Sequence, residues 1–156
     1  SSFVVGEYLK NDVNEFAGIE LSAEVAIRNF SVKPKLDKRD SAELKLSIHY
    51  QGETPAIHDL CVLIYTARGV RAAIVDLRPY FSSFVHRPGE IVIQGDITSL
   101  NLVEGDYNIG LYYAINENRK ELQNLMNITL LSATTESIKY QAQYRGIVET
   151  QFEPVV

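Results

Sequence analysis

The stretch Ala42-Glu43-Leu44-Lys45-Leu46-Ser47-Ile48-His49-Tyr50 decides the fold class, because apolar and polar residues alternate along nearly its whole length. The apolar face holds Leu44, Leu46, Ile48 and Tyr50, and the polar face holds Lys45, Ser47 and His49. A period of two is typical of a half-buried β-strand. The turn-forming run Gln51-Gly52-Glu53-Thr54-Pro55 ends the strand. The stretch therefore predicts a strand over residues 42–50 with the core on one side.

Further short apolar segments lie on both sides of this strand, with turn signals between them. They cover residues 25–32, 60–66, 72–78, 91–94, 107–115, 126–131 and 146–152. Residues 60–66 are apolar on both faces, which indicates a central position in a sheet. Short helical turns are expected at residues 12–16 and 117–125. About eight antiparallel strands predict an all-β fold, an immunoglobulin-like or jelly-roll β-sandwich.

The run Leu102-Val103-Glu104-Gly105-Asp106-Tyr107 refines the expected topology. A Tyr that opens a strand after an acidic residue and Gly is typical of a tyrosine corner, whose phenol bonds back to the preceding crossover. On this phase Tyr107, Ile109, Leu111 and Tyr113 are expected to point into the core, and Asn108, Gly110, Tyr112 and Ala114 outward.

Length and composition exclude several classes of protein. The chain has 156 residues, 46% of them hydrophobic and 22% charged, so we expect an ordered globular chain. No linker or repeat divides it, which predicts a single domain over 1–156 with residues 1–24 as a less regular N-terminal segment. No apolar run approaches the roughly 18 residues that span a membrane. A lone cysteine, Cys61, suggests a reducing compartment, and the missing initial Met suggests a piece of a longer protein.

The chain offers no sequence motif for catalysis, metal binding or nucleic-acid binding. The formal net charge is −5, without the basic excess of a nucleic-acid-binding domain. No phosphate loop, nucleophile elbow or metal-ligand spacing is present. We therefore expect no catalytic residues, no metal and no cofactor, and we expect Cys61 to be a buried, inert thiol.

What remains is a binding surface rich in Tyr, of which the chain has nine. Sugars are bound by aromatic faces together with planar polar groups such as Asp, Asn and Arg. The candidate ligand-binding residues are Asp76, Arg78, Tyr80, His86, Arg87, Asn108 and Tyr112. The two-residue spacing of Asp76, Arg78 and Tyr80 predicts that these three share one strand face. The candidate residues would converge if residues 60–66, 72–78, 107–115 and 126–131 formed one sheet and the loop with His86 and Arg87 overhung it. The alternative is that Asp76 and Arg78 form a surface ion pair and the tyrosines merely cover a sheet.

Residues 19–152 resemble the C-terminal carbohydrate-binding domain of Wzt, the nucleotide-binding subunit of ABC transporters that export O-antigen polysaccharides. The resemblance rests on the strands at 25–32 and 42–50, the apolar hairpin from Leu60 to Gly69, the segment 97–107 and the terminal strand, which begins at Gly146 and ends at Phe152. Its most specific part is Leu100 to Tyr107.

This resemblance implies a non-catalytic module that recognises the modified non-reducing end of a lipid-linked O-antigen glycan. It also implies a preceding ATPase domain that joins the membrane subunit of the transporter, a cytoplasmic place at the inner membrane, and a homodimer formed by exchange of the strand 146–152. The basic residues Arg68, Arg78, Arg87 and His86 favour an anionic cap on the glycan. Two alternatives remain open: an immunoglobulin-like structural or adhesion domain of a surface protein, and a hydrolase built on a jelly roll.

Overall fold

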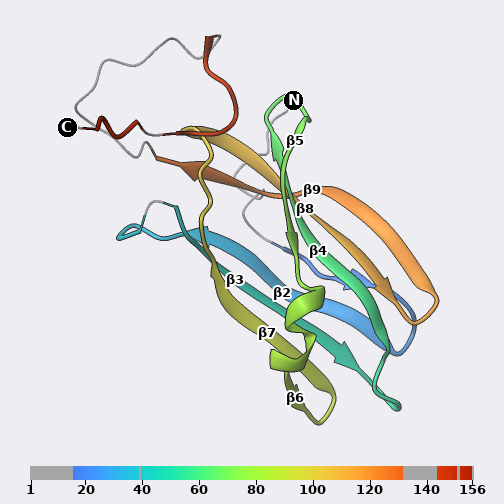
Figure 1. The fold of residues 1–156 in the computed structure, drawn as a ribbon. Helices are drawn as coiled ribbons and strands as arrows, with labels where there is room; N and C mark the ends of the chain where they lie inside the picture. The colour runs from blue at the N-terminus through green and yellow to red at the C-terminus, as the bar shows by residue number, and fades with distance from the viewer. Residues whose placement is uncertain (1–15, 39, 132–143, 151, 156) are drawn as a thin grey trace.

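The computed structural model describes residues 16–38, 40–131, 144–150 and 152–155, and within them the chain forms two antiparallel sheets packed face to face (Figure 1). The five-stranded sheet has the order β1 (Ile19–Glu20), β2 (Val25–Pro34), β3 (Ala42–Tyr50), β7 (Glu90–Ile97) and β6 (Val85–Arg87). The four-stranded sheet has the order β5 (Arg71–Asp76), β4 (Ile57–Thr66), β8 (Gly105–Ile115) and β9 (Asn118–Leu130). A 3-10 helix, η2 (Arg78–Ser83), follows β5. The predicted all-β sandwich is confirmed, with nine strands among the described residues.

The alternation that predicted β3 also places the core. Leu44, Leu46 and Ile48 are buried, whereas Lys45 and His49 are exposed. The buried side chains of β3 meet those of the opposite sheet, such as Ile64 and Ile109, in one hydrophobic cluster. Removing this apolar area from water is the main favourable term in forming the sandwich.

The strand β4 is central, as its apolar character on both faces predicts. It pairs with β5 on one side and with β8 on the other. Its inner residues join the main core, while Cys61, Leu63 and Tyr65 form a second buried cluster on the outer face, with Tyr112 packed against it. The four segments that were expected to share a sheet do so.

The tyrosine corner is present. The Tyr107 hydroxyl donates a hydrogen bond to the Val103 carbonyl oxygen at 2.6 Å, and burial raises the pKa of this phenol. Gly105 has φ 144°, in the left-handed region that favours glycine. The phase that follows from Tyr107 is correct for the inner face, since Ile109, Leu111 and Tyr113 are buried.

The local structure predicted for residues 117–125 is wrong. Residues 117–125 form no helical turn but a hairpin with β8, which turns at Asn116, whose φ is 52°. Gly110 and Ala114 lie on the outer face of β8, as expected, since they pair with Leu63 and Asp59 of β4. Both are nevertheless buried, and β9 closes over Gly110 so tightly that a Cβ there would collide with the Leu122 carbonyl oxygen.

The terminal segment 146–152 does not form the predicted strand within its described part. A single bridge pairs Val148 with Leu102, flanked by hydrogen bonds from the Val103 amide to the Ile147 carbonyl (2.8 Å) and from the Glu149 amide to the Asn101 carbonyl (2.7 Å). The helical turn expected at 12–16 lies outside the described residues except for Phe16. In the part of the chain that the structure describes, no helix has the length and hydropathy to cross a membrane.

Candidate functional site

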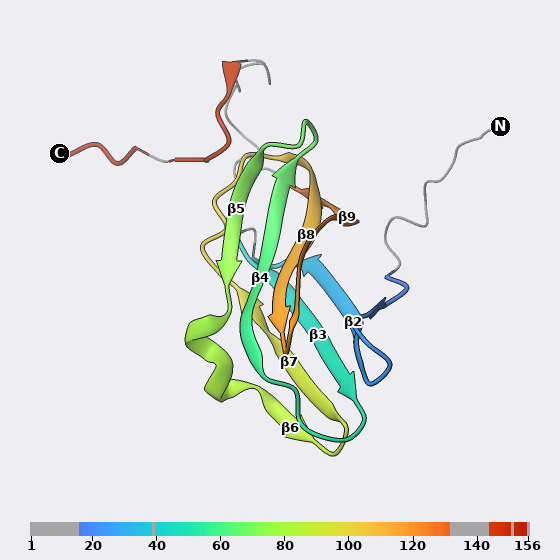
Figure 2. The ribbon, with the colours of Figure 1, turned by 90° about the vertical axis from the view of Figure 1, so that its right-hand side faces the viewer.

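A groove of about 660 Å³ opens between the edges of the two sheets. One wall is β5, an edge strand of the four-stranded sheet. The other wall is the second half of β7. On one side β7 pairs with β3 along its whole length, but on the other side β6 pairs only with Glu90 to Val92, so within the described residues this edge of β7 is open beyond Val92. The helix η2 connects β5 to β6 (Figure 2). It contributes Tyr80 and Ser83 to the lining of the groove.

The groove combines an apolar floor with a polar rim. The buried residues in its lining are Leu44, Leu77, Ile93, Ile97 and Leu100. The polar residues in its lining are Asp76, Tyr80, Ser83, Gln94, Asp96, Thr98 and Ser99. Tyr80 presents its ring to solvent, with 58% of the residue exposed. Size and lining match those of small-ligand pockets in proteins.

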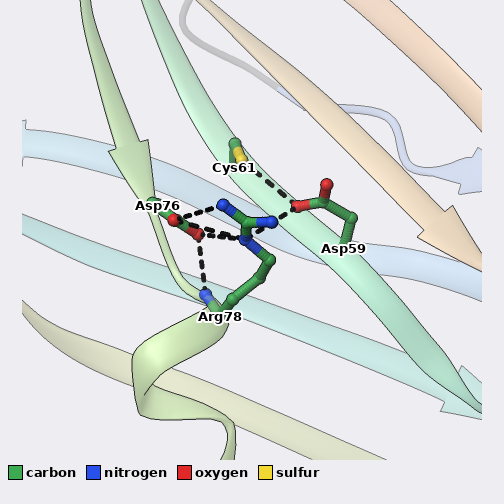
Figure 3. A network of polar contacts seen from close by, with 4 residues as sticks. All are labelled: Asp59, Cys61, Asp76 and Arg78. Carbon is green, nitrogen blue, oxygen red and sulfur yellow. Dashed lines mark hydrogen bonds and ion pairs between the residues drawn. The ribbon is translucent and has the colours of Figure 1, made fainter.

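Arg78 ties the start of η2 to the sheet beside the groove (Figure 3). Its guanidinium donates to both oxygens of Asp76, with Nη2 to Oδ2 at 2.9 Å and Nε to Oδ1 at 3.0 Å. The backbone N–H of Arg78 also donates to Asp76 Oδ1 at 3.0 Å. Asp59 on β4 lies 3.8 Å from the guanidinium, and the Cys61 thiol donates to Asp59 at 3.4 Å. Four residues from β4, β5 and η2 thus form one network.

The charges in this network follow from these contacts. The hydrogen bonds from Arg78 lower the pKa of Asp76, so this carboxylate is ionised at neutral pH, and Asp76 in turn raises the pKa of Arg78. Burial raises the pKa of the Cys61 thiol to about 11, and the hydrogen bond to Asp59 adds to the shift. Cys61 is therefore a neutral thiol, as the sequence predicted for a buried, inert cysteine.

Asp59, Cys61 and Asp76 place one potential metal-ligand atom each within 4.8 Å of one another. The guanidinium of Arg78 already contacts both carboxylates. A thiol must be deprotonated to bind a metal, and the pKa of about 11 opposes this. Arg78 therefore already supplies the positive charge that a metal ion would bring to these carboxylates.

A second polar network lies on the outer face of the four-stranded sheet. The Tyr65 hydroxyl donates to Glu121 at 2.8 Å and accepts from Arg71 at 2.9 Å, and Arg71 also contacts Glu121 at 3.0 Å. The Arg71 guanidinium lies 5.4 Å from the centre of the Tyr65 ring. Together these bonds lower the pKa of Glu121, with the bond from Tyr65 as the largest cause.

The structure brings only some of the predicted ligand-binding residues together. Asp76 and Tyr80 line the groove, and Arg78 holds Asp76 beside it. Asn108 and Tyr112 are half-buried on β8, outside the lining of the groove.

His86 and Arg87 were expected to overhang the same sheet, but they form part of β6 in the five-stranded sheet. There Arg87 lies 4.0 Å from Glu90. The expectation that Asp76, Arg78 and Tyr80 share a strand face is also wrong, because β5 ends at Asp76 and Arg78 and Tyr80 lie in η2. Pro79 lacks the N–H that a continuing strand would need.

Sequence reasoning missed the residues that β4, β7 and the segment after β7 bring to the site, namely Asp59, Cys61, Gln94, Asp96 and Ser99. Asp59 and Cys61 have the two-residue spacing of one strand face, which could have linked them to Asp76 through the hairpin. Gln94, Asp96 and Ser99 carry no local signal, because their place in the groove depends on how the two sheets pack.

No protein-family model matches this chain, and no curated protein matches it either. Among solved structures, the chain is similar to the C-terminal domain of Wzt, with a TM-score of 0.50 and 12% sequence identity over 91% of this chain and 89% of that one. The two chains therefore share a fold over nearly their whole length, as the sequence resemblance implied.

Proposed function

We propose that this chain is a non-catalytic carbohydrate-binding module of an ABC transporter for O-antigen polysaccharide, and that it binds the modified non-reducing end of the glycan. The observation that carries the proposal is the groove between β5 and β7, which joins an exposed tyrosine ring to a rim of hydrogen-bonding groups. The shared fold with the C-terminal domain of Wzt and the sequence resemblance to that family support the same function.

The groove suits the end of a glycan in shape and chemistry. Its volume of about 660 Å³ holds one or a few sugar rings. The exposed ring of Tyr80 can pack against the C–H face of a sugar. The Asp76 and Asp96 carboxylates can accept hydrogen bonds from sugar hydroxyl groups, and the Gln94 amide can accept or donate them. A sugar end that leaves one polar group of the rim without a hydrogen bond binds less favourably by about 1–3 kcal/mol. Two or three such groups therefore separate the affinities of the right and the wrong glycan end by about a hundredfold or more.

The electrostatics of the site favour binding over catalysis. A glycoside hydrolase needs a carboxylic acid whose pKa is raised so that it can protonate the leaving group. The pKa of Asp76 is shifted the other way, by its hydrogen bonds with Arg78. A nucleophilic cysteine needs a lowered pKa, and that of Cys61 is raised to about 11.

In the transporter, such a module selects the finished chains that are passed to the membrane subunit. The sequence resemblance supports a preceding ATPase domain and a cytoplasmic place at the inner membrane. ATP hydrolysis then belongs to that other domain, and this chain contributes the specificity for the glycan end.

We propose in addition that two copies associate through the C-terminal segment, as the resemblance implies. Beyond the bridge at Val148, the described residues extend away from the sandwich in both views (Figures 1 and 2). Phe152 is 86% exposed and Val155 is fully exposed, which is costly for apolar side chains without a partner. Light scattering should give the mass of a dimer for the chain and of a monomer for Phe152→Asp, while Leu36→Asp, a matched change at an equally exposed loop residue, keeps the dimer. A monomeric chain contradicts this part of the proposal.

Glycan binding is tested by calorimetry after a screen on an array of bacterial O-antigen polysaccharides. The chain should bind at least one of them saturably. Tyr80→Ala should weaken binding at least about tenfold, whereas Tyr80→Phe, which keeps the ring, should stay within about threefold. Two results would contradict the proposal. One is that the folded chain binds no glycan on the array, and the other is that Tyr80→Ala binds as tightly as the unchanged chain.

A further inference from the structure

The charged residues in the groove all have one sign. Within the described part of the chain, the lining contains two ionisable carboxylates, Asp76 and Asp96, and no Lys, Arg or His. Asp76 is ionised at neutral pH because its hydrogen bonds with Arg78 lower its pKa. An anionic ligand in this groove would meet negative charge at both walls, since Asp76 lies at the end of β5 and Asp96 on β7.

The cations nearest to these carboxylates are already paired. Arg78 binds Asp76 through two parallel N–H to oxygen bonds, the strongest geometry for such a pair. The Lys35 ammonium donates to Asp96 Oδ2 at 2.9 Å, and this bond raises the pKa of Lys35. Turning either cation toward a bound anion would leave a carboxylate unpaired at the rim, so neither is available at low cost.

Like Arg78, the other basic residues from which the sequence predicted an anionic cap lie outside the lining of the groove. Arg87 is in β6 and lies 4.0 Å from Glu90, and His86 is its neighbour in the same strand. Arg68 is exposed in the turn between β4 and β5. None of the three is among the residues that line the groove.

The floor of the groove adds a second constraint. Leu77, Ile93 and Ile97 are buried beneath the polar rim, and Phe84 joins them in the lining. Burying an apolar group of the ligand against such a surface makes binding more favourable, whereas desolvating a charged group there makes binding less favourable. A deoxy, O-methyl or O-acyl substituent on a sugar would find apolar contacts there.

We infer that the groove selects an uncharged glycan end carrying an apolar substituent, and that it excludes ends bearing a carboxylate or a phosphate. This inference rests on the proposed glycan-binding function and specifies its ligand class. Discrimination comes from a lining that holds two carboxylates and no cation to receive an anion, and from the apolar floor, which holds the substituent.

The test uses three trisaccharides that differ only in the terminal sugar: a 6-deoxyhexose, the parent hexose, and its uronic acid. They are built on the repeat unit of the polysaccharide that the array identifies. Calorimetry on the unchanged chain should give an affinity for the deoxy end at least about threefold above the parent and at least about tenfold above the uronic acid.

A variant with a positive charge in the groove tests whether the lack of a cation in the lining causes the preference for the uncharged end. Gln94→Lys adds a cation to the lining and should reduce the preference for the uncharged end by at least about fivefold. Gln123→Lys adds the same charge on β9, at the opposite edge of the four-stranded sheet, and should leave the preference unchanged.

Two results would overturn the inference while glycan binding stands. One is tighter binding of the uronic acid than of the deoxy sugar, and the other is an equal effect of Gln94→Lys and Gln123→Lys. A folded chain that binds none of the polysaccharides on the array contradicts the glycan-binding function itself and the inference with it.

Discussion

The carboxylate of Asp76 accepts hydrogen bonds from both the backbone N–H and the guanidinium of Arg78, two residues later in the chain. The strand β5 ends at Asp76 and η2 begins at Arg78. The pair therefore fixes the point where the chain leaves the sheet and sets the direction of η2, which carries Tyr80 into the groove lining. A surface ion pair of this kind contributes little to global stability. Its effect is local, on the position of the residues that follow.

Arg78→Gln should therefore loosen η2 without unfolding the sandwich. Gln cannot make the paired bonds of a guanidinium to a carboxylate, so the segment from Arg78 to Phe84 should open more often. Hydrogen exchange followed by mass spectrometry should show amide exchange at least about fivefold faster in this segment, with β4 and β8 unchanged.

Arg71→Gln is the matched control for this change. It breaks the contact between Arg71 and Glu121, also an exposed ion pair of an arginine, but it touches no residue of η2. Exchange in η2 should stay at the level of the unchanged chain. Equal acceleration in both variants, or none in Arg78→Gln, contradicts the local role of Arg78.

The same ion pair predicts a dependence of stability on pH. The pKa of Asp76 is lower in the folded chain than its ordinary value of 3.8, chiefly because of its bonds with Arg78. Asp76 therefore stabilises the folded state at pH values above its ordinary pKa. This stabilisation is lost as the pH falls from the ordinary pKa through the lower pKa of the folded state.

Urea unfolding of the chain and of Asp76→Asn measures this contribution. The difference in free energy of unfolding between the two should be constant from about pH 5 to pH 8 and should shrink as the pH falls below the ordinary pKa of 3.8. A difference that does not shrink below that pKa, or that grows as the pH falls, contradicts the assigned cause.

Cys61 should react slowly with thiol reagents in the folded chain. Burial and the hydrogen bond to Asp59 raise its pKa from 9.0 to about 11, which lowers the fraction of thiolate at pH 8 by about a hundredfold. Alkylation by iodoacetamide at this pH, followed by mass spectrometry, should be at least that much slower than for the same chain unfolded in urea. Rates within tenfold of each other would show that the thiol is neither buried nor bonded as described.

The sequence predicted those features of the fold that depend on local pattern. The strand at 42–50 was predicted with its observed ends because alternation there is nearly strict, and the corner at Tyr107 because its signals lie within six residues. The helical turn at 117–125 was wrongly predicted because pairing with β8 outweighs the local preference of a polar segment.

The site was harder to predict for a different physical reason. Asp76 and Tyr80 lie four residues apart, so a local pattern could bring them together, although they proved to belong to a strand and a 3-10 helix instead of one strand. Gln94 and Asp96 reach the groove only because β7 lies opposite β5 across the sandwich. Such a juxtaposition depends on sheet packing, which a single sequence does not encode in any local window.

Among the described glycines, Gly110 is the one where an added methyl group would collide with the backbone. A Cβ there would collide with the backbone carbonyl of Leu122, where the pairing of β8 with β9 is irregular between Ile109 and Leu111. A backbone atom cannot move aside as a flexible side chain can, so Gly110→Ala should force the two strands apart and lower the free energy of unfolding by about 2 kcal/mol or more.

Gly95→Ala on β7 is the control, because nothing lies within 4 Å of a Cβ at that position. It should change the free energy of unfolding by less than about 1 kcal/mol, with a small gain expected from the reduced freedom of the unfolded chain. Urea unfolding of both variants makes the comparison. If Gly110→Ala is as stable as Gly95→Ala, then β9 does not close over β8 as tightly as described here, and the burial of the outer face at Gly110 loses its explanation.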